Sequence, residues 1–367
     1  MKLMFVIKTM THGTGGAERV LSQITSELCG LGHEVSLVTF DSLGQKPFYA
    51  LDERIRRIDL GLGDPQKKSG VAITLKRISA LRRTARSEQP DAVIAFMHSA
   101  FVPAAFAFVG TGIPVIGSEH IVPAYYDRRK LEFAFFLFSL PFLRKITVVS
   151  KKIRDSYPAF ARRKMVVVPN PVKRPLPGLE GLRDLTKRPV ILNVGRLDPQ
   201  KDQETLIRAF SALTPRFPDW DLRIIGEGGL RPELENLISE LNLKGRVFLP
   251  GLSGDIDREY AAASLFVIPS RYEAFGLATA EAMTYGIPAI GFADCPGTNE
   301  IIEDGHNGLL AKGEHRVNAL AEFMEKLMKS KEYRKQLGEK ASVSHAQLTP
   351  ESIARLWDDF LRGIISP

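Results

Sequence analysis

Cysteine is scarce in this chain of 367 residues. The two cysteines, Cys29 and Cys295, cannot make a disulfide framework and neither lies in a metal-type pair, so we expect a reducing compartment. The seven histidines show no H-x-x-x-H spacing. These absences argue against a disulfide-stabilised secreted scaffold and against a metal held by the protein.

Long hydrophobic runs are also absent. No stretch reaches the roughly 18 apolar residues that a spanning helix needs. The N-terminus, "MKLMFVIKTM", has only four consecutive apolar residues between its first two lysines, which predicts a strand and not a signal peptide. No low-complexity tract predicts disorder. We therefore expect a globular protein in the cytoplasm.

Positive charge is plentiful but unevenly distributed. Residues 1–190 contain 30 Lys and Arg against 16 Asp and Glu, a charge of +14, whereas the remainder contains 20 against 26, a charge of −6. The basic half suggests an anionic partner there, which could be a membrane surface, a phosphate-bearing acceptor or nucleic acid.

The pattern of strands and helices runs twice along the chain. Strands are predicted at 3–7, 34–40, 91–97, 114–120, 145–150 and 164–172, and again at 189–195, 220–228, 247–251, 264–270 and 288–292. Strands that alternate with helices indicate a parallel sheet covered on both faces. We predict an α/β protein of two Rossmann-like domains facing a central cleft. The first comprises 1–172 plus a terminal helix in 349–367, the linker is 173–188, and the second is 189–348.

Two glycine loops could bring backbone N–H groups to a phosphate. The dinucleotide fingerprint G-x-G-x-x-G fails in both, because its sixth position is Glu18 when counted from Gly13 and Arg231 when counted from Gly226. Asp41 does end the second strand, as a ribose ligand would, so a dehydrogenase is weakened and not excluded. Tight turns without a ligand are the alternative for both loops.

A pair of cations follows the first strand of the second domain, in "GRLDPQKD" (195–202). Arg196 and Lys201 are five residues apart across a turn, so a loop there can direct both toward one anion. Arginine binds phosphate oxygens with two donors and lysine acts as a point charge. A solvated loop with scattered charge is the alternative.

Two glutamates in "SRYEAFGLATAEAMTYG", Glu273 and Glu281, are separated by eight positions. On one continuous helix they would lie about 80° apart, on no common face. We expect instead that the helix begins near Phe275 or Gly276, which leaves Glu273 in the loop after a strand. The free N–H groups of Gly276 and Leu277 would then suit a diphosphate between the two carboxylates. The alternative is a surface helix with two solvated acids.

The segment "EAFGLATAE" resembles the E-x7-E motif of retaining GT-B glycosyltransferases of family 4. Other segments follow in that family's order: "GTGGAER", "GSEH", "VPNPV", "GRLDPQKD", "GEG" and "FLPG". The resemblance spans nearly the whole chain. It implies the GT-B fold, with the C-terminal helix packing back on the N-terminal domain.

The resemblance also implies roles for the matched positions. Arg196 and Lys201 would bind the donor's diphosphate, and Gly15 and Gly16 would bring backbone amides close to it. Glu273 would bind hydroxyls of the transferred sugar and support the developing positive charge.

On the nucleoside side, Glu281 would bind ribose and the backbone near Leu249 and Pro250 would contact the base. His120, in "GSEH", would lie at the sugar and assist catalysis. A buried structural histidine is the alternative reading of His120.

The implied reaction needs neither a metal nor a cofactor, because the nucleotide sugar is a substrate. The β-phosphate oxygen leaves while held by Arg196 and Lys201, and the acceptor hydroxyl attacks from the same face. Configuration at the anomeric carbon is retained, and the protein contributes positioning and electrostatic stabilisation. Uridine diphosphate is the expected carrier, with an N-acetylhexosamine favoured over a hexose.

The acceptor side is expected in the basic half. Residues 125–145 combine Arg128, Arg129 and Lys130 with five phenylalanines and a second basic pair, which is typical of an interfacial helix. Residues 76–86 add another basic face. We predict a polyprenyl-diphosphate-linked glycan acceptor and peripheral attachment to the anionic inner face of the cell membrane. A core helix with a basic edge, and a soluble acceptor, are the alternatives.

Two other functional classes stay open. A nucleic-acid-binding protein would use the +14 half, but no helix-turn-helix, zinc or RNA-binding signature occurs, so no nucleic acid is expected. A non-catalytic nucleotide-sugar sensor would keep the same binding residues without turnover.

Overall fold

The protein is described by a computed structural model that covers residues 1–11, 15–63 and 70–365. It divides into two compact units. Unit 1 comprises Met1–Pro171 and Leu348–Pro367, and unit 2 comprises Val172–Gln347. The stretch 173–188 is grouped with unit 2, where the short helix η3 (Leu182–Leu185) contacts α9 (Ile256–Ala262).

Unit 1 is built on a seven-stranded parallel sheet of order β3-β2-β1-β4-β5-β6-β7. Its central strand, AVIAF at Ala92–Phe96, is apolar and buried throughout, as expected for a sheet covered on both faces. The strands are β1 (Lys2–Val6), β2 (Glu34–Thr39), β3 (Arg56–Asp59), β4 (Ala92–Phe96), β5 (Val115–Glu119), β6 (Lys145–Val148) and β7 (Met165–Val167).

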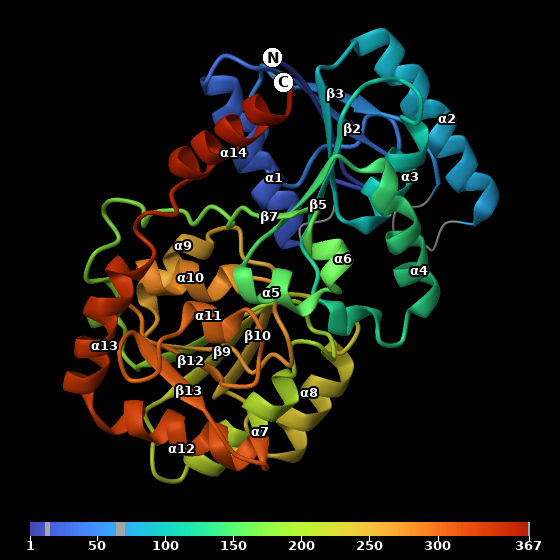
Figure 1. Cartoon of the computed structure of the whole chain (residues 1–367). Helices are drawn as coiled ribbons and strands as arrows, with labels where there is room; N and C mark the ends of the chain where they lie inside the picture. Colours follow the sequence, from blue (N-terminus) through green and yellow to red (C-terminus); the bar gives the residue numbers. More distant parts are fainter. Residues whose placement is uncertain (12–14, 64–69, 366–367) are drawn as a thin grey trace. The chain divides into compact units, whose positions relative to one another are not determined.

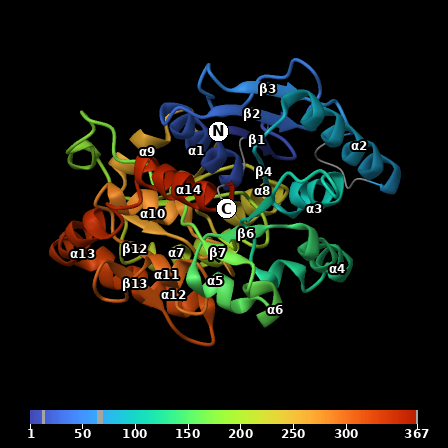
Figure 2. The same ribbon diagram turned by 45° about the horizontal axis from the view of Figure 1, so that its top comes forward.

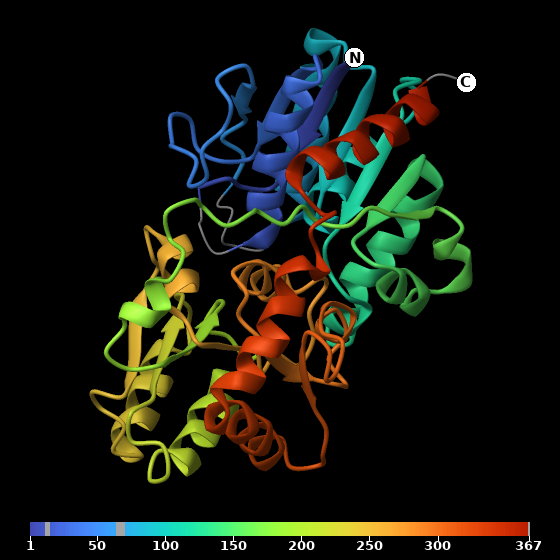
Figure 3. The same cartoon turned by 90° about the vertical axis from the view of Figure 1, so that its left-hand side faces the viewer.

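Helices cover both faces of this sheet (Figure 1). The C-terminal helix packs against α1 and lies beside it in Figure 3, and His33 Nε2 contacts Asp358 Oδ1 at 3.0 Å. The predicted return of the C-terminal helix to the N-terminal domain is therefore confirmed. The helices are α1 (Gly16–Gly30), α2 (Val71–Glu88), α3 (His98–Ala107), η1 (Pro123–Tyr126), α4 (Lys130–Ser139), η2 (Leu140–Phe142), α5 (Lys151–Ser156), α6 (Ala159–Arg162) and α14 (Pro350–Ile365).

Unit 2 repeats the arrangement with a six-stranded parallel sheet of order β10-β9-β8-β11-β12-β13. The two domains are thus both Rossmann-like, as predicted. The strands are β8 (Val190–Val194), β9 (Asp221–Ile225), β10 (Val247–Gly251), β11 (Leu265–Val267), β12 (Ala289–Phe292) and β13 (Gly308–Ala311).

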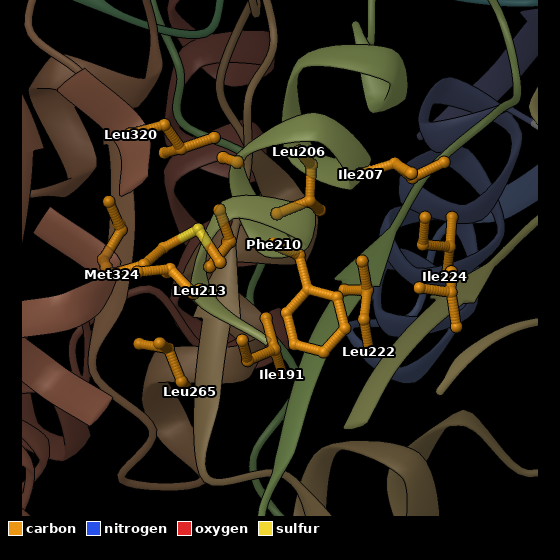
Figure 4. Close-up of a cluster of buried hydrophobic side chains, with 14 of the residues drawn as sticks. Ile191, Leu206, Ile207, Phe210, Leu213, Leu222, Ile224, Leu265, Leu320 and Met324 are labelled. Atoms are coloured by element: carbon orange, nitrogen blue, oxygen red, sulfur yellow. The ribbon is translucent and has the colours of Figure 1, made fainter. Parts of the chain in front are cut away.

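The core of unit 2 lies between this sheet and the helices that cover it. Phe210, Leu213 and Leu206 point from α7 toward the sheet residues Ile191 and Leu222, as Figure 4 shows. Figure 2 shows α12 and α13 as consecutive helices at the edge of the unit, and α12 also packs on α7. The helices are α7 (Gln203–Leu213), α8 (Arg231–Glu240), α9, α10 (Leu277–Thr284), α11 (Thr298–Ile301), α12 (Arg316–Lys329) and α13 (Lys331–Ser344).

Three strands differ most from the sequence prediction, and β9 and β11, which were predicted over 220–228 and 264–270, also end three residues early. The edge strands β3 and β13 were not expected, because "RRID" and "GLLA" are short and β3 carries charge. β7 was predicted over 164–172 but ends at Val167. Two prolines follow it, Pro169 and Pro171, and proline has no N–H to donate to a ladder.

Candidate functional site

The second sheet has a topological switch point between β8 and β11. The chain leaves β8 toward β9 on one side, and leaves β11 toward β12 on the other. Open α/β sheets bind ligands outside the carboxyl ends of the strands at such a point. The loop after β8 carries Arg196 and Lys201, and the loop after β11 carries Glu273. The structure therefore brings these three predicted residues to one place in the sheet.

Lys201 and Glu273 meet directly. The Lys201 ammonium donates to Glu273 Oε1 at 2.6 Å, and the Ser270 hydroxyl donates to the same oxygen at 2.6 Å. The other oxygen, Oε2, accepts no hydrogen bond from any residue that the structure describes. Glu273 is only 7% exposed. A carboxylate oriented in this way can accept hydrogen bonds from a ligand hydroxyl through its second oxygen.

Close backbone contacts fix the loop that carries Glu273. The Glu273 amide donates to the carbonyl oxygen of Pro296 at 2.9 Å. A Cβ on the neighbouring Gly297 would lie 2.4 Å from the Glu273 carbonyl oxygen, and Gly297 has a φ of +78°. Only glycine fits there without strain.

The loops after β8 and β11 are also joined to each other. The Gln200 side chain donates to the carbonyl of Tyr272 at 2.9 Å, and the Arg271 amide donates to the carbonyl of Gln200 at 2.9 Å. These two hydrogen bonds to main-chain carbonyls join the loop of Lys201 to the loop of Glu273 and so fix the positions of both residues.

Arg196 lies at the same edge of the sheet but has a different partner. Its guanidinium contacts Asp198 Oδ2 at 3.1 Å, and its side chain is 49% exposed. Its carbonyl oxygen accepts from the Gln203 side chain at 2.8 Å, which anchors the backbone while the guanidinium faces solvent. An exposed guanidinium on an anchored backbone is able to turn toward an anion.

The two glutamates are divided between a loop and a helix, as predicted. α10 begins at Leu277, its N-cap Gly276 has a φ of +83°, and Glu273 lies in the preceding loop. The amides of Gly276 and Leu277 donate to no described residue, so the first turn of α10 keeps free donors. The alternative of two solvated acids is wrong, because Glu281 is 3% exposed and Glu273 is also buried.

Glu281 lies in the first two turns of α10, where it contacts a tyrosine. The Tyr260 hydroxyl donates to Glu281 Oε2 at 3.2 Å, and the Tyr260 ring stacks on Tyr285 at 5.6 Å. Tyr285 in turn donates to Asp257 at 2.5 Å. Glu281 is therefore held by Tyr260, whose ring is itself stacked on Tyr285 at the C-terminal end of α10.

Leu249 and Pro250 lie in β10, away from the helix of Glu281 in the sequence. The Leu249 carbonyl oxygen accepts from Arg231 at 3.1 Å, and Arg231 is fixed by two hydrogen bonds to Glu227, at 2.9 and 2.6 Å. Pro250 is exposed. The pair of Arg231 and Glu227 thus orders the strand end that was predicted to meet a base.

In unit 1, Gly15 and Gly16 open helix α1. Gly15 is its N-cap in an extended conformation with no side-chain cap, and a Cβ on Gly16 would meet nothing within 4 Å. The rest of the predicted glycine loop, residues 12–14, lies outside the described residues. Neighbouring protein atoms thus do not require glycine at position 16.

His120 follows β5 in the same unit. Its Nε2 lies 3.0 Å from the Ser118 hydroxyl, and its ring stacks on Phe96 with centroids 5.0 Å apart. Burial lowers the pKa of His120 to about 4, so the ring is neutral near pH 7. The structure does not bring His120 into contact with other predicted site residues of unit 1.

The neighbouring Glu119 points into the protein. It is fully buried, its Oε2 accepts from the Tyr126 hydroxyl at 2.9 Å, and its Oε1 accepts from the Ile121 amide at 3.1 Å. Burial raises the pKa of Glu119 to about 8. This carboxyl therefore supports the turn after His120.

Comparison with known proteins decides the family. Residues 14–174 match the family model "Glycosyltransferase Family 4", and residues 181–343 match "Glycosyl transferases group 1". The chain is a glycosyltransferase of the GT-B fold.

One relative and two solved structures similar to the chain each cover 92% of it or more. It is 26% identical over 339 residues to the Campylobacter jejuni "GalNAc-alpha-(1->4)-GalNAc-alpha-(1->3)-diNAcBac-PP-undecaprenol alpha-1,4-N-acetyl-D-galactosaminyltransferase", covering 92% of this chain and 91% of that one. Sucrose-phosphate synthase from Thermosynechococcus elongatus has a similar structure, with a TM-score of 0.86 at 20% identity and full coverage of both chains. Anabaena HepE in complex with UDP and glucose has a TM-score of 0.79 at 20% identity, covering 99% of this chain and 100% of that one.

In this glycosyltransferase, both carboxylate oxygens of Asp41 accept hydrogen bonds from other residues of unit 1. Its Oδ1 accepts from Thr9 at 2.5 Å, and its Oδ2 accepts from the Met10 amide at 2.8 Å. Asp41 therefore holds the loop after β1 and has no exposure for a ribose. The dehydrogenase alternative fails at this residue.

Sequence reasoning missed several residues of the glycosyltransferase site. Ser270 was overlooked because a lone serine carries no pattern, although its place three residues before Glu273 is a usable signal. Gly297 and Tyr260 lie 24 and 13 residues from Glu273 in the sequence, and only the folded sheet brings Gly297 against its backbone. Such long-range contacts leave no local spacing to detect.

Within the described ranges, no group of three or more His, Cys, Asp or Glu side chains is arranged to hold a metal ion. Over the same residues, no helix has both the length and the apolar character needed to cross a bilayer.

Proposed function

We propose that this glycosyltransferase moves a sugar from a nucleoside diphosphate sugar to a hydroxyl of a glycan acceptor, with retention of anomeric configuration. The observation that carries the proposal is the contact of Lys201 with Glu273 at the switch point of the second sheet. A cation for phosphate and a carboxylate for sugar hydroxyls occur there together, next to the free amides of α10.

The reaction follows from those groups. The bond between the anomeric carbon and the β-phosphate oxygen breaks, and Lys201, Arg196 and the amides of Gly276 and Leu277 take up the charge on the leaving diphosphate. The acceptor hydroxyl forms the new bond on the same face and passes its proton to that phosphate oxygen. Glu273 Oε2 binds a sugar hydroxyl and stabilises positive charge at the anomeric carbon. No protein nucleophile and no metal are needed in this scheme.

The nucleoside is assigned to the ends of β10 and α10. Glu281 would bind ribose hydroxyls, and the backbone at Leu249 and Pro250 would contact the base. Gly15 and Gly16 would bring amides of unit 1 to the diphosphate. We propose UDP as the carrier, which HepE binds in its solved complex. An N-acetylhexosamine is favoured over a hexose by the Campylobacter relative.

The acceptor is proposed to be linked to a polyprenyl diphosphate at an anionic membrane surface. One face of α4 and η2 is exposed and apolar, with spacings of four, three and four residues: Leu131, Phe135, Phe138 and Phe142. The opposite side is buried at Phe136. Exposed cations flank this face at Arg128, Lys130 and Arg144, a pattern suited to an anionic bilayer.

A thermal-shift panel of nucleotide sugars, followed by turnover assays with lipid-linked and water-soluble acceptors, tests the function. We expect a UDP-sugar to raise the melting temperature most, and an anomeric configuration that is retained in the product by NMR. Absence of turnover despite nucleotide-sugar binding would support the sensor, and salt-dependent DNA binding alone would support the nucleic-acid-binding class.

A liposome experiment tests the membrane surface. The double variant Phe135→Ser and Phe138→Ser should lose sedimentation with anionic vesicles at low salt, because it removes two exposed apolar anchors. The matched control Val343→Ser, which removes an exposed apolar side chain from unit 2, should sediment as the wild type does. If wild-type protein ignores the vesicles and uses a soluble acceptor as well as a lipid-linked one, the membrane proposal is wrong.

A further inference from the structure

A chain of hydrogen bonds leads from β6 of the first sheet to His120. Thr147, in β6, donates its hydroxyl proton to Ser118 Oγ at 2.9 Å. Ser118, in the paired strand β5, lies 3.0 Å from His120 Nε2. Ser118 and Thr147 are each 2% exposed. The chain therefore runs through the dry interior of the sheet and ends at one ring nitrogen.

The surroundings of Ser118 decide the direction of the second bond. A serine hydroxyl has one proton to donate and two lone pairs. Among the described residues, the buried Ser118 hydroxyl bonds only Thr147, from which it accepts, and His120. Donation from Nε2 would leave the serine proton buried without an acceptor, which is costly, so Ser118 donates and Nε2 accepts. A neutral imidazole that accepts at Nε2 carries its proton at Nδ1. Nδ1 makes no hydrogen bond to a described residue and is not among the buried atoms that lack a partner.

The plane of the ring is fixed independently. The His120 ring is inclined by 22° to the Phe96 ring on which it stacks, and Phe96 stacks on Trp357 of α14 at 6.3 Å. Burial lowers the pKa of His120 and keeps the ring neutral near pH 7. Stacking and hydrogen bonding together leave the ring little freedom to flip.

We infer that Ser118 and Thr147 are positioning residues that hold His120 as the neutral Nδ1–H tautomer, so that His120 donates a hydrogen bond to the ligand and does not serve as a general base. This inference rests on the proposed function and on the role that the family resemblance implies for His120, which is to lie at the transferred sugar. A base would need a free lone pair directed at the acceptor hydroxyl. Here the lone pair of Nε2 is occupied by Ser118, so deprotonation of the acceptor falls to the departing phosphate.

The tautomer can be measured without any substrate. The protein is labelled with 15N-histidine, and two-bond 15N–1H correlation spectra are recorded from pH 5 to 8, with His120→Gln used to assign the signal. We expect the Nδ1–H pattern over this whole range. An Nε2–H pattern, or protonation near the ordinary histidine pKa of about 6.5, would overturn the inference.

A matched pair of variants tests the role of Ser118. Ser118→Thr and Ser118→Val have nearly the same shape in the strand, but only threonine keeps the hydroxyl. We expect Ser118→Thr to keep the Nδ1–H signal, and Ser118→Val to lose it and to reduce kcat roughly ten-fold or more relative to Ser118→Thr. The acidic limb of its pH profile should also move up, because the bond that favours the neutral ring is gone.

The outcomes separate the two proposals. The positioning role of Ser118 is contradicted if Ser118→Thr and Ser118→Val have the same kcat and the same spectra. The role of Thr147 is contradicted if Thr147→Val changes neither the tautomer of His120 nor kcat. If the valine variant does not fold, the wild-type spectrum still decides the tautomer. An Nδ1–H spectrum without transfer from any nucleotide sugar would count against the proposed function alone.

Discussion

The two units share one strand order but use different chemistry at the strand ends. In unit 2, the loops after β8 and β11 bring opposite charges together, with Lys201 and Glu273 in contact. In unit 1, the end of β5 carries two groups that are neutral near pH 7, a histidine whose pKa is lowered to about 4 and a glutamate whose pKa is raised to about 8. The same topology thus supplies a place for a ligand without dictating its charge.

The largest expected effect separates the cores of the two units. Phe210→Ala removes a fully buried ring from unit 2, and Trp357→Ala removes one from unit 1. Each should lower the free energy of unfolding of its own unit by about 3–5 kcal/mol, because transfer and cavity terms add. Differential scanning calorimetry should show each variant moving a different transition. If both variants move the same single transition equally, the two cores do not unfold separately.

The next effect tests the charged site of unit 2. Glu273→Gln and Lys201→Met should each reduce kcat by about 10²–10³, since each removes electrostatic stabilisation of the transition state. The double variant should fall much less than the product of the two, because the side chains are in contact at 2.6 Å. Steady-state kinetics with circular dichroism as the folding check measures this. Wild-type kcat in either single variant would refute the site.

A smaller effect tests the neutral site of unit 1. The pKa of Glu119 rises from 4.5 to about 8 on folding, so between these values the folded state holds a proton that the unfolded state has lost. The contribution of Glu119 to the free energy of unfolding is fully present below about pH 4.5. It falls as the pH rises toward 8, by up to about 1.4 kcal/mol per pH unit.

Glu119→Gln removes that titration while keeping an acceptor for the Ile121 amide. Urea denaturation over a pH series should therefore give a flatter stability profile for the variant than for the wild type between pH 5 and 8. Parallel profiles would mean that Glu119 stays ionised in the folded protein, which would contradict a neutral carboxyl at the end of β5.

The smallest effects come from single polar contacts in each unit. Asp358→Ala removes the bond to His33 in unit 1, and Asp255→Ala removes the cap of α9, where Asp255 accepts from the Arg258 amide at 3.1 Å. Each should cost about 0.5–2 kcal/mol. Hydrogen exchange read unit by unit should place each loss in its own unit, and a loss spread over both would contradict that.

The sequence predicted the site better than it predicted the edges of the sheets. Strong apolar runs and glycine stops predicted the inner strands within one to three residues at each end. The short edge strands β3 and β13 were not predicted, β3 because it is charged and β13 because its four residues are too few to show a period. Helix α10 was placed within one or two residues of its start, since Gly276 marks the end of the loop and an eight-residue spacing fits no single helical face.

By itself, the sequence determined the fold class, the two-domain order and the residue types at the strand ends, because hydrophobic period and motif order are local or sequential properties. Only the tertiary structure decided the partners. That Glu273 Oε1 is shared by Lys201 and Ser270 depends on two loops which the sheet order places side by side. That Ser118 and Thr147 reach His120 depends on the pairing of β5 with β6. The bonds Lys201–Glu273 and Thr147–Ser118 join residues 72 and 29 positions apart in the chain, and no pattern within one segment encodes them.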